Sequence, residues 1–377
     1  MRVLFVASIF GHITAFHIPF IKLLKSKGYE VWVACNKSKS NSMPERDLEN
    51  LGVKCITIDF TRSPFTLKTI KALSQLRHLL KYNDFNLIHV HTPTAALLTR
   101  FINSRVKKNP IIYTAHGFHF FRGAPLRNWF IYFPLERMAA KWTNKIITIN
   151  KEDYKRAKKI FKQSRVVSYV QGVGVESFIK NWDKEEKITF KKGLGIPDDS
   201  IVITYIAEIN KNKNHYFLLR NWKEIKKSCP KSVLLIVGDG NKRTGVEQFI
   251  LDEQLVDVHL LGYRNDIDKI LEITDVVTLL SYREGLPKSI MEAMAAGLPC
   301  VVSDTRGLRD LITDGHNGYV IPHNDDSLLI RTFVTLLNDE SLRHKLGKAS
   351  LLSVEPYKLE NVLKEYEIVY NEILESR

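Results

Sequence analysis

The 377-residue sequence lacks several features that would each point to a particular kind of protein. No stretch approaches the roughly 18 uninterrupted apolar residues of a membrane-spanning helix, and Met1–Phe10 is too short for a secretion signal. Four scattered cysteines without a C-x-x-C pair predict neither a zinc site nor a disulfide framework. No G-x-G-x-x-G follows the first apolar run, so a nicotinamide or flavin cofactor is not supported. We therefore expect a cytoplasmic protein with reduced cysteines and no cofactor.

The charge is distributed unevenly along the chain. Residues 1–180 contain 30 Lys or Arg and 10 Asp or Glu, a balance of +20. Residues 181–377 contain 26 and 31, a balance of −5. The length suits two domains rather than one. The asymmetry predicts that only the first half binds an anionic partner or surface.

Two series of short apolar runs alternate with helical stretches. This alternation is typical of an α/β protein with doubly wound parallel sheets that are covered by helices on both faces. The first series predicts strands at Arg2–Ile9, Glu30–Cys35, Val53–Asp59, Leu87–His91, Ile111–Ala115 and Lys145–Ile149. The second predicts strands at Ile201–Ile206, Ser232–Val237, Val258–Leu261, Asp275–Leu280, Pro299–Ser303 and Gly318–Ile321. After the first strand we expect a turn at Gly11 and a helix from about Thr14 to Lys27.

The pattern loosens between the two series. We expect a first Rossmann-like domain over residues 1–170, a linker over 171–198 and a second Rossmann-like domain over 199–354. We expect residues 355–377 to form a C-terminal helix that packs back on the first domain. Open parallel sheets bind ligands at the carboxyl ends of their strands, so a cleft that both domains face is the expected site.

The most informative stretch runs from Tyr282 to Cys300. An apolar run precedes it, Pro287 suits a first helical turn, and Gly297 suits the end of the helix. A strand, a turn and a helix N-terminus together present backbone N–H groups that attract phosphate. Two carboxylates in this unit, Glu284 and Glu292, are suited to accept hydroxyl groups of a sugar.

This stretch resembles the E-x7-E motif of the retaining glycosyltransferases of family 4, within the sequence Ser-Tyr-Arg-Glu-Gly-Leu-Pro-Lys-Ser-Ile-Met-Glu. The resemblance implies a GT-B fold, two facing Rossmann-like domains with a last helix that crosses back to the first. It assigns Glu284 to the donor sugar and Glu292 to the ribose of the nucleotide. Gly285 and Leu286 would supply backbone N–H groups to the diphosphate, without a bound metal ion.

Further donor contacts follow from the same resemblance. Lys213 matches a lysine that neutralises the diphosphate, whereas Glu208 stands where the family has an arginine. An acid there repels the diphosphate, so we expect Lys213 to carry more of the neutralisation and Glu208 to orient Lys213 or the donor. Arg264 lies in a turn that the family uses to seat the base. The glycines Gly238 and Gly240 are interpreted as plain turn formers.

The first domain contributes histidines. Within Tyr113–Phe121, His116 is placed near the reacting sugar by the resemblance, and His119 packs or touches the acceptor. Gly11 would let backbone approach the diphosphate, and His12 and His17 are candidate acceptor contacts, with a plain helix-face role as the alternative. His89 and His91 are expected to face opposite sides of their strand and therefore not to form a metal pair. We predict no metal site.

The resulting hypothesis is a retaining transferase that moves a hexose or N-acetylhexosamine from a UDP-sugar to a surface polysaccharide acceptor. Catalysis would use His116, Glu284 and Lys213. The expected acceptor is polyprenyl-diphosphate-linked, and the basic half is expected to sit on the inner face of the cell membrane. A nucleotide-sugar 2-epimerase of the same fold and a non-enzymatic polyanion-binding protein are the alternatives, although no nucleic-acid-binding signature is present.

Overall fold

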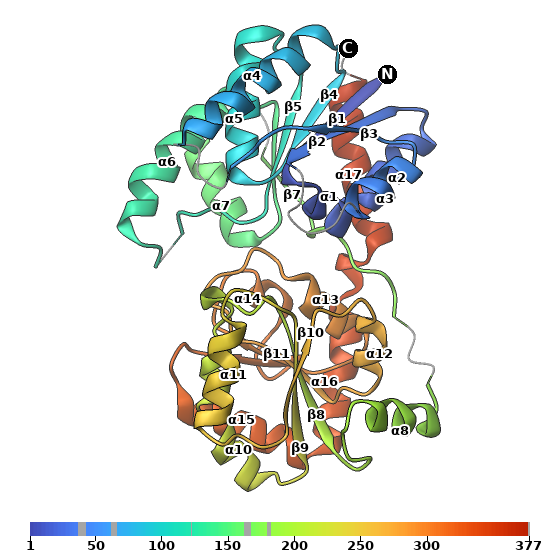
Figure 1. The fold of residues 1–377 in the computed structure, drawn as a ribbon, viewed down its shortest axis with the longest axis vertical. Helices are drawn as coiled ribbons and strands as arrows, with labels where there is room; N and C mark the ends of the chain where they lie inside the picture. Colours follow the sequence, from blue (N-terminus) through green and yellow to red (C-terminus); the bar gives the residue numbers. More distant parts are fainter. Residues whose placement is uncertain (37–42, 62–65, 122, 162–166, 179–181, 376–377) are drawn as a thin grey trace. The chain divides into compact units, whose positions relative to one another are not determined.

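The structure, a computed structural model, describes residues 1–36, 43–61, 66–121, 123–161, 167–178 and 182–375. The chain forms two compact units. One consists of Met1–Val173 together with Glu360–Arg377, and the other of Gly174–Leu359. Each unit is built around its own parallel sheet (Figure 1). No helix among the described residues is long and apolar enough to cross a bilayer.

The first unit contains a seven-stranded sheet of order β3-β2-β1-β4-β5-β6-β7, in which all pairs are parallel. Its strands are β1 (Arg2–Ile9), β2 (Glu30–Asn36), β3 (Lys54–Thr57), β4 (Leu87–Val90), β5 (Ile111–Ala115), β6 (Lys145–Thr148) and β7 (Val167–Tyr169). Its helices are α1 (Phe10–Phe16), α2 (Ile18–Ser26), α3 (Met43–Asn50), α4 (Leu67–Tyr82), α5 (Pro93–Val106), α6 (Leu126–Ala140), α7 (Lys151–Ile160) and α17 (Leu359–Leu374).

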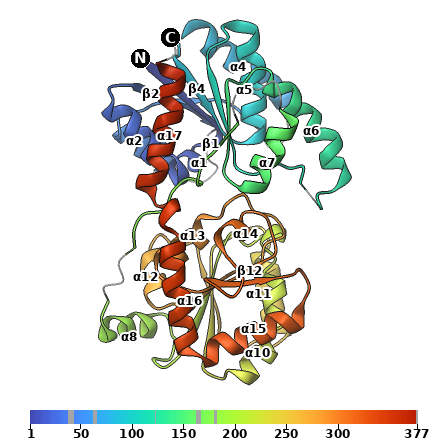
Figure 2. The ribbon, with the colours of Figure 1, turned by 180° about the vertical axis from the view of Figure 1, so that it is seen from behind.

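Alternate residues of β1 face opposite layers, as expected of a strand that is buried on both sides. Leu4 and Val6 pack with apolar residues of α4, α5 and α6. On the other face, α17 lies beside α2 (Figure 2). The rings of Tyr366 in α17 and Phe20 in α2 are 4.4 Å apart. The chain therefore returns to the first unit through its last helix, as the family resemblance implied.

The second unit contains a six-stranded parallel sheet of order β10-β9-β8-β11-β12-β13. Its strands are β8 (Ile201–Ile206), β9 (Ser232–Val237), β10 (Val258–Gly262), β11 (Val276–Leu279), β12 (Cys300–Ser303) and β13 (Gly318–Ile321). Its helices are α8 (Lys184–Gly193), α9 (His215–Leu219), α10 (Trp222–Ser228), α11 (Arg243–Asp252), α12 (Ile267–Glu272), α13 (Lys288–Ala295), α14 (Leu308–Leu311), α15 (Asp326–Asn338) and α16 (Glu340–Ser353), with short 3-10 helices η1 (Lys211–Lys213) and η2 (Glu355–Tyr357).

All twelve predicted strands are present, and three details differ from the sequence-based expectations. The strand β7 was not predicted. The first helix begins at Phe10 instead of Thr14 and is interrupted at His17, because Pro19 follows and has no N–H to donate. Residues 174–198 group with the second unit and include α8, which begins with a capping box of Asp183 and Glu186. Residues 179–181 of the expected linker lie outside the described residues.

Candidate active site

The turn after β11 and the start of α13 form as the sequence predicts. Pro287 is the N-cap of α13 in an extended conformation. Gly297 follows the helix with a φ of +67°, and the N–H groups of Gly297 and Leu298 donate to Met294 and Ala293. This pair of hydrogen bonds is a Schellman motif. The short helix α13 is thus closed at its C-terminus and has its N-terminus at the carboxyl ends of the strands, where parallel sheets bind anions.

Lys213 and Glu284 form an ion pair in the second unit. Lys213 Nζ lies 2.7 Å from Glu284 Oε1. The two side chains are only 20% and 10% exposed, which limits the screening of the pair by water. The carboxylate partner of Lys213 is therefore Glu284 and not Glu208, which was the expected partner. Glu208 is exposed and forms no ion pair with any described residue.

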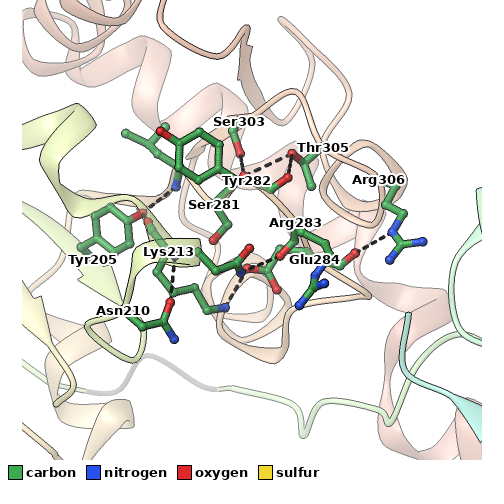
Figure 3. A network of polar contacts seen from close by, with 12 residues as sticks. Tyr205, Asn210, Lys213, Ser281, Tyr282, Arg283, Glu284, Ser303, Thr305 and Arg306 are labelled. Carbon is green, nitrogen blue, oxygen red and sulfur yellow. Dashed lines mark hydrogen bonds and ion pairs between the residues drawn. The ribbon is translucent and has the colours of Figure 1, made fainter. Parts of the chain in front are cut away.

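Hydrogen bonds fix the two loops that carry this pair (Figure 3). The backbone of Lys213 is held by the side chain of Asn210 and by the hydroxyl of Tyr205, which donates to its carbonyl. The same hydroxyl accepts from the N–H of Leu280 at 2.8 Å. Asn212 joins the loops directly, since its carbonyl accepts from Tyr282 and its side chain donates to the carbonyl of residue 283. The ammonium and the carboxylate are therefore preorganised.

The end of β12 and the loop that follows it are hydrogen-bonded to the turn that carries Glu284. Ser303 and Thr305 donate to the carbonyl of Ser281 at 2.6 and 3.1 Å, and Arg306 Nε donates to the carbonyl of Glu284 at 3.2 Å (Figure 3). Gly307 packs so closely that a Cβ there would lie 2.0 Å from the carbonyl oxygen of Gly285. This support was not predicted from the sequence. Its one local signal is a glycine in the turn that follows an apolar strand.

Gly285 and Leu286 supply free backbone donors. In the part of the chain that the structure describes, neither N–H group donates to a protein acceptor. Both lie next to the Lys213–Glu284 pair and to the N-terminus of α13. Backbone donors, a helix N-terminus and an ammonium group in one place are the components of a phosphate site.

Glu292 lies one turn into α13 and is paired with Lys288 on the same helix, with Nζ and Oε1 3.4 Å apart. Burial raises the pKa of Glu292, and nearby Glu176 adds to that effect, whereas Lys288 opposes it. The effect of burial on the pKa of Glu292 exceeds the opposing effect of Lys288, because the lysine side chain is itself 41% exposed. Among the described residues the second oxygen of Glu292 has no hydrogen-bond partner, and a partly desolvated carboxylate of this kind is suited to accept hydroxyl donors from a ligand.

The other predicted donor contacts lie in neighbouring loops of the same sheet. Arg264, after β10, forms two hydrogen bonds of 2.8 and 2.6 Å with Asp266, which raise the pKa of the guanidinium and occupy it. Its side chain is therefore committed within the protein. Gly238 and Gly240 are not plain turn formers, since a Cβ at these positions would lie 2.0 and 2.4 Å from carbonyl oxygens of the loop after β8.

In the first unit, four histidines converge at the carboxyl ends of the neighbouring strands β1, β4 and β5. His12 belongs to α1, His17 lies between α1 and α2, and His91 and His116 directly follow β4 and β5. Burial lowers the pKa of His12 to about 4 and holds the pKa values of the other three well below the usual range. All four imidazoles are therefore neutral at pH 7.

The expectation for His89 and His91 was wrong. Residues two apart in a strand face the same side of a sheet, and their ring centroids are 4.1 Å apart. His89 is fully buried and bonded on both nitrogens, to Tyr370 of α17 at 3.0 Å and to Thr114 at 2.8 Å. His91 instead belongs to the histidine cluster with His12, His17 and His116.

The remaining first-unit candidates occupy different environments. His17 is fully buried, so it packs within the histidine cluster and cannot contact an acceptor. His119 stacks on Tyr132 of α6 with ring centroids 4.5 Å apart, a packing role. Gly11 lies in the first turn of α1, where an added Cβ would meet no described atom within 4 Å. Within the cluster, only the residues His12 and His116 are less than fully buried.

Both halves of the chain match glycosyltransferase family models. Residues 2–150 match the family described as "Glycosyl transferase 4-like", and residues 186–351 match "Glycosyl transferases group 1". A Bacillus subtilis protein named "Putative glycosyltransferase EpsD" is 32% identical over 92% of this chain and 90% of its own length. An Escherichia coli enzyme, UDP-Gal:alpha-D-GlcNAc-diphosphoundecaprenol alpha-1,3-galactosyltransferase, is 31% identical over 85% of this chain and 83% of its own.

A solved structure shares the fold. HepE of Anabaena, crystallised with UDP and glucose, superposes with a TM-score of 0.80 at 17% identity, over 99% of this chain and 100% of that one. The chain therefore belongs to the glycosyltransferases of family 4 and has the two parallel-sheet units of a GT-B enzyme.

Proposed function

We propose that this glycosyltransferase transfers a hexose or N-acetylhexosamine from a UDP-sugar, with retention of configuration, to a polyprenyl-diphosphate-linked saccharide. The observation that carries the proposal is the Lys213–Glu284 pair beside the free N–H groups of Gly285 and Leu286. Lys213 and the N–H groups would stabilise the charge that develops on the departing diphosphate, and the second oxygen of Glu284 would hold sugar hydroxyls. Glu292 would accept the ribose hydroxyls.

The first unit would supply His116 to the sugar and His12 to the acceptor. A neutral imidazole can donate one hydrogen bond and accept another, which suits hydroxyl recognition. The names of the relatives support the choice of substrates. The Escherichia coli enzyme is named for UDP-galactose and a diphosphoundecaprenol acceptor, and the solved HepE structure contains UDP.

Two measurements test the donor and the reaction. Titration calorimetry with UDP should show binding that Glu292→Ala weakens by at least about tenfold, since charge-assisted hydrogen bonds contribute about 1.5–3 kcal/mol each. The matched control is Glu253→Ala, an exposed acid in the same unit. Transfer from each UDP-sugar to a synthetic polyprenyl-diphosphate saccharide, followed by NMR of the anomeric proton, reports sugar and stereochemistry. Conversion of the UDP-sugar without any acceptor would instead indicate the 2-epimerase.

We further propose that the first unit docks on an anionic membrane surface through α6. This helix exposes Leu126, Phe130, Ile131 and Met138, at 74, 77, 43 and 42%, together with Arg127 and Arg137, and the exposed Lys141 follows at its C-cap. The aromatic residues Phe118 and Phe120 of the same unit are buried in the core and do not contribute to this surface. Burial of each large apolar side chain contributes about 1.5–3 kcal/mol, and each basic residue near anionic lipid about 1 kcal/mol.

Co-sedimentation of the full chain with vesicles tests this docking. Phe130→Asp should reduce binding to vesicles that contain phosphatidylglycerol by at least about tenfold, the equivalent of 1.4 kcal/mol. Leu251→Asp, which changes an exposed leucine of α11 in the second unit, is the control and should leave binding unchanged. Equal effects of the two substitutions, or binding that is indifferent to lipid charge, would contradict docking through α6.

A further inference from the structure

The proposed function uses His12 and His116 but leaves the two buried members of the histidine cluster without a role. Sugar recognition needs only groups that a ligand can reach, whereas His17 and His91 are fully buried. Burial of polar groups that lack hydrogen bonds is costly. Nδ1 of His17 and Nε2 of His91 are both buried without a hydrogen-bond partner among the described residues. The cluster therefore contains two buried imidazoles for which the transfer reaction supplies no partner.

The spacing of the nitrogens is close to that of a tetrahedral metal site. Nε2 of His12 and Nε2 of His17 are 3.4 Å apart, and Nε2 of His116 and Nδ1 of His91 are 3.3 Å apart. Zn–N bonds of about 2.0–2.1 Å place tetrahedral ligands about 3.3–3.4 Å from each other. One nitrogen from each of the four residues lies within 4.8 Å of the other three. The wider separations, and the stacking of the His17 and His91 rings at 3.9 Å, require a side-chain rotation on binding.

The chemical nature of the four ligands also restricts which metal ion the site could bind. No carboxylate or thiolate belongs to the group. An all-imidazole set suits Zn²⁺, Cu²⁺ and Ni²⁺ rather than Mg²⁺ or Ca²⁺, which prefer oxygen ligands.

We propose that His12, His17, His91 and His116 form a binding site for one divalent transition metal ion, and that Zn²⁺ is a suitable probe. The site lies wholly in the first unit and shares no residue with the donor contacts of the second, and an ion held by His12 and His116 would compete with the sugar and the acceptor for these two side chains. A bound ion would tie α1 and the following residue to the ends of β4 and β5 and would stabilise this unit. The proposal departs from the sequence-based expectation of no metal site, which rested partly on the incorrect facing of His89 and His91.

The test uses the full chain after treatment with a chelator. Calorimetry with ZnCl₂ should show one ion bound per chain, and Co²⁺ should give the intense visible absorption of a tetrahedral complex. His12→Gln and His116→Gln, at the two partly exposed positions, should each weaken Zn²⁺ binding by at least about tenfold, since even outer-shell changes cost 10–100-fold. His78→Gln is the control, because His78 is an exposed histidine of α4 in the same unit.

The outcomes separate the alternatives. Circular dichroism of each variant, compared with the unaltered chain, shows whether it is folded. Zn²⁺ binding that survives both cluster substitutions would assign the metal to other histidines and overturn the proposal. Absence of Zn²⁺ binding, or only the weak absorption of octahedral Co²⁺, in the unaltered chain would overturn it without any variant. UDP binding at Glu292 is unaffected by either result, so this test and that of the proposed function can fail separately.

Discussion

Replacement of Gly307 by alanine should disrupt the donor site from a distance. Gly307 precedes α14 and has φ +77° and ψ −44°, a conformation that residues with a side chain rarely adopt. A Cβ there would lie 2.0 Å from the carbonyl oxygen of Gly285 and 2.7 Å from its carbon. Van der Waals contact between carbon and these atoms requires more than 3 Å, so the Gly285 turn must move by about 1 Å.

Two costs follow from the substitution, and a control separates them. Backbone strain contributes about 1–3 kcal/mol to destabilisation. Gly315→Ala introduces strain of the same kind, since Gly315 has φ +70°, but its Cβ would meet no described atom within 4 Å. Displacement of the turn is therefore specific to Gly307→Ala. A misplacement of about 1 Å at a reacting centre costs as much as 100-fold in rate.

Thermal unfolding and UDP calorimetry measure the two costs. Both variants should unfold at lower temperature than the unaltered chain, whereas only Gly307→Ala should weaken UDP binding, by at least about tenfold or 1.4 kcal/mol. If Gly307→Ala binds UDP as Gly315→Ala does, the Gly285 turn does not hold the diphosphate, and the assignment of its N–H groups is wrong.

Three further substitutions test individual side chains of the second unit. Lys213→Ala should lower turnover strongly and leave circular dichroism unchanged; a rate within about threefold of the parent, under 1 kcal/mol, would remove the lysine from the diphosphate. Glu284→Gln should lower the transfer rate but leave affinity for free UDP equal or higher, as calorimetry would show. Because burial raises the pKa of Glu292 in the folded state, its ionisation destabilises the fold as pH rises above the unfolded value. Glu292→Gln should therefore raise the melting temperature at pH 8 and have less effect near pH 4, and a pH-independent difference would contradict the assigned cause.

The fold could be predicted because its determinants are local. Each predicted strand is an apolar run that is bounded by turn residues, and strands buried on both faces need no longer-range signal. The strand β7 was not predicted because it has only three residues, Val-Ser-Tyr, which are half-buried at the edge of the sheet. The interruption at His17 also has a local signal in Pro19, although the periodicity of the apolar residues continues through it.

The candidate site could be predicted only in part, for the same reason. The caps of α13 follow from Pro287 and Gly297, which act within one helical turn. The pairing of Lys213 with Glu284 joins residues 71 positions apart and depends on the adjacency of β8 and β11 in the sheet. Glu208 was the nearer carboxylate in sequence, but it is exposed. Order along the chain does not reveal which loops meet when a parallel sheet reverses its strand order.

The Lys213–Glu284 pair couples recognition of the diphosphate to recognition of the sugar. As a neutral pair, it attracts a free diphosphate less than Lys213 alone would, because Glu284 repels the phosphates. At an effective dielectric constant of 20, two unit charges 8 Å apart repel by about 2 kcal/mol. A UDP-sugar offsets this repulsion with hydroxyl donors for the carboxylate, whereas UDP after transfer has none to offer. The donor should therefore bind better than the product, and Glu284→Gln should abolish that preference. If Glu284→Gln instead lowers the affinity for free UDP, as removal of the ammonium group in Lys213→Ala should, the carboxylate serves to position the lysine rather than to hold the sugar.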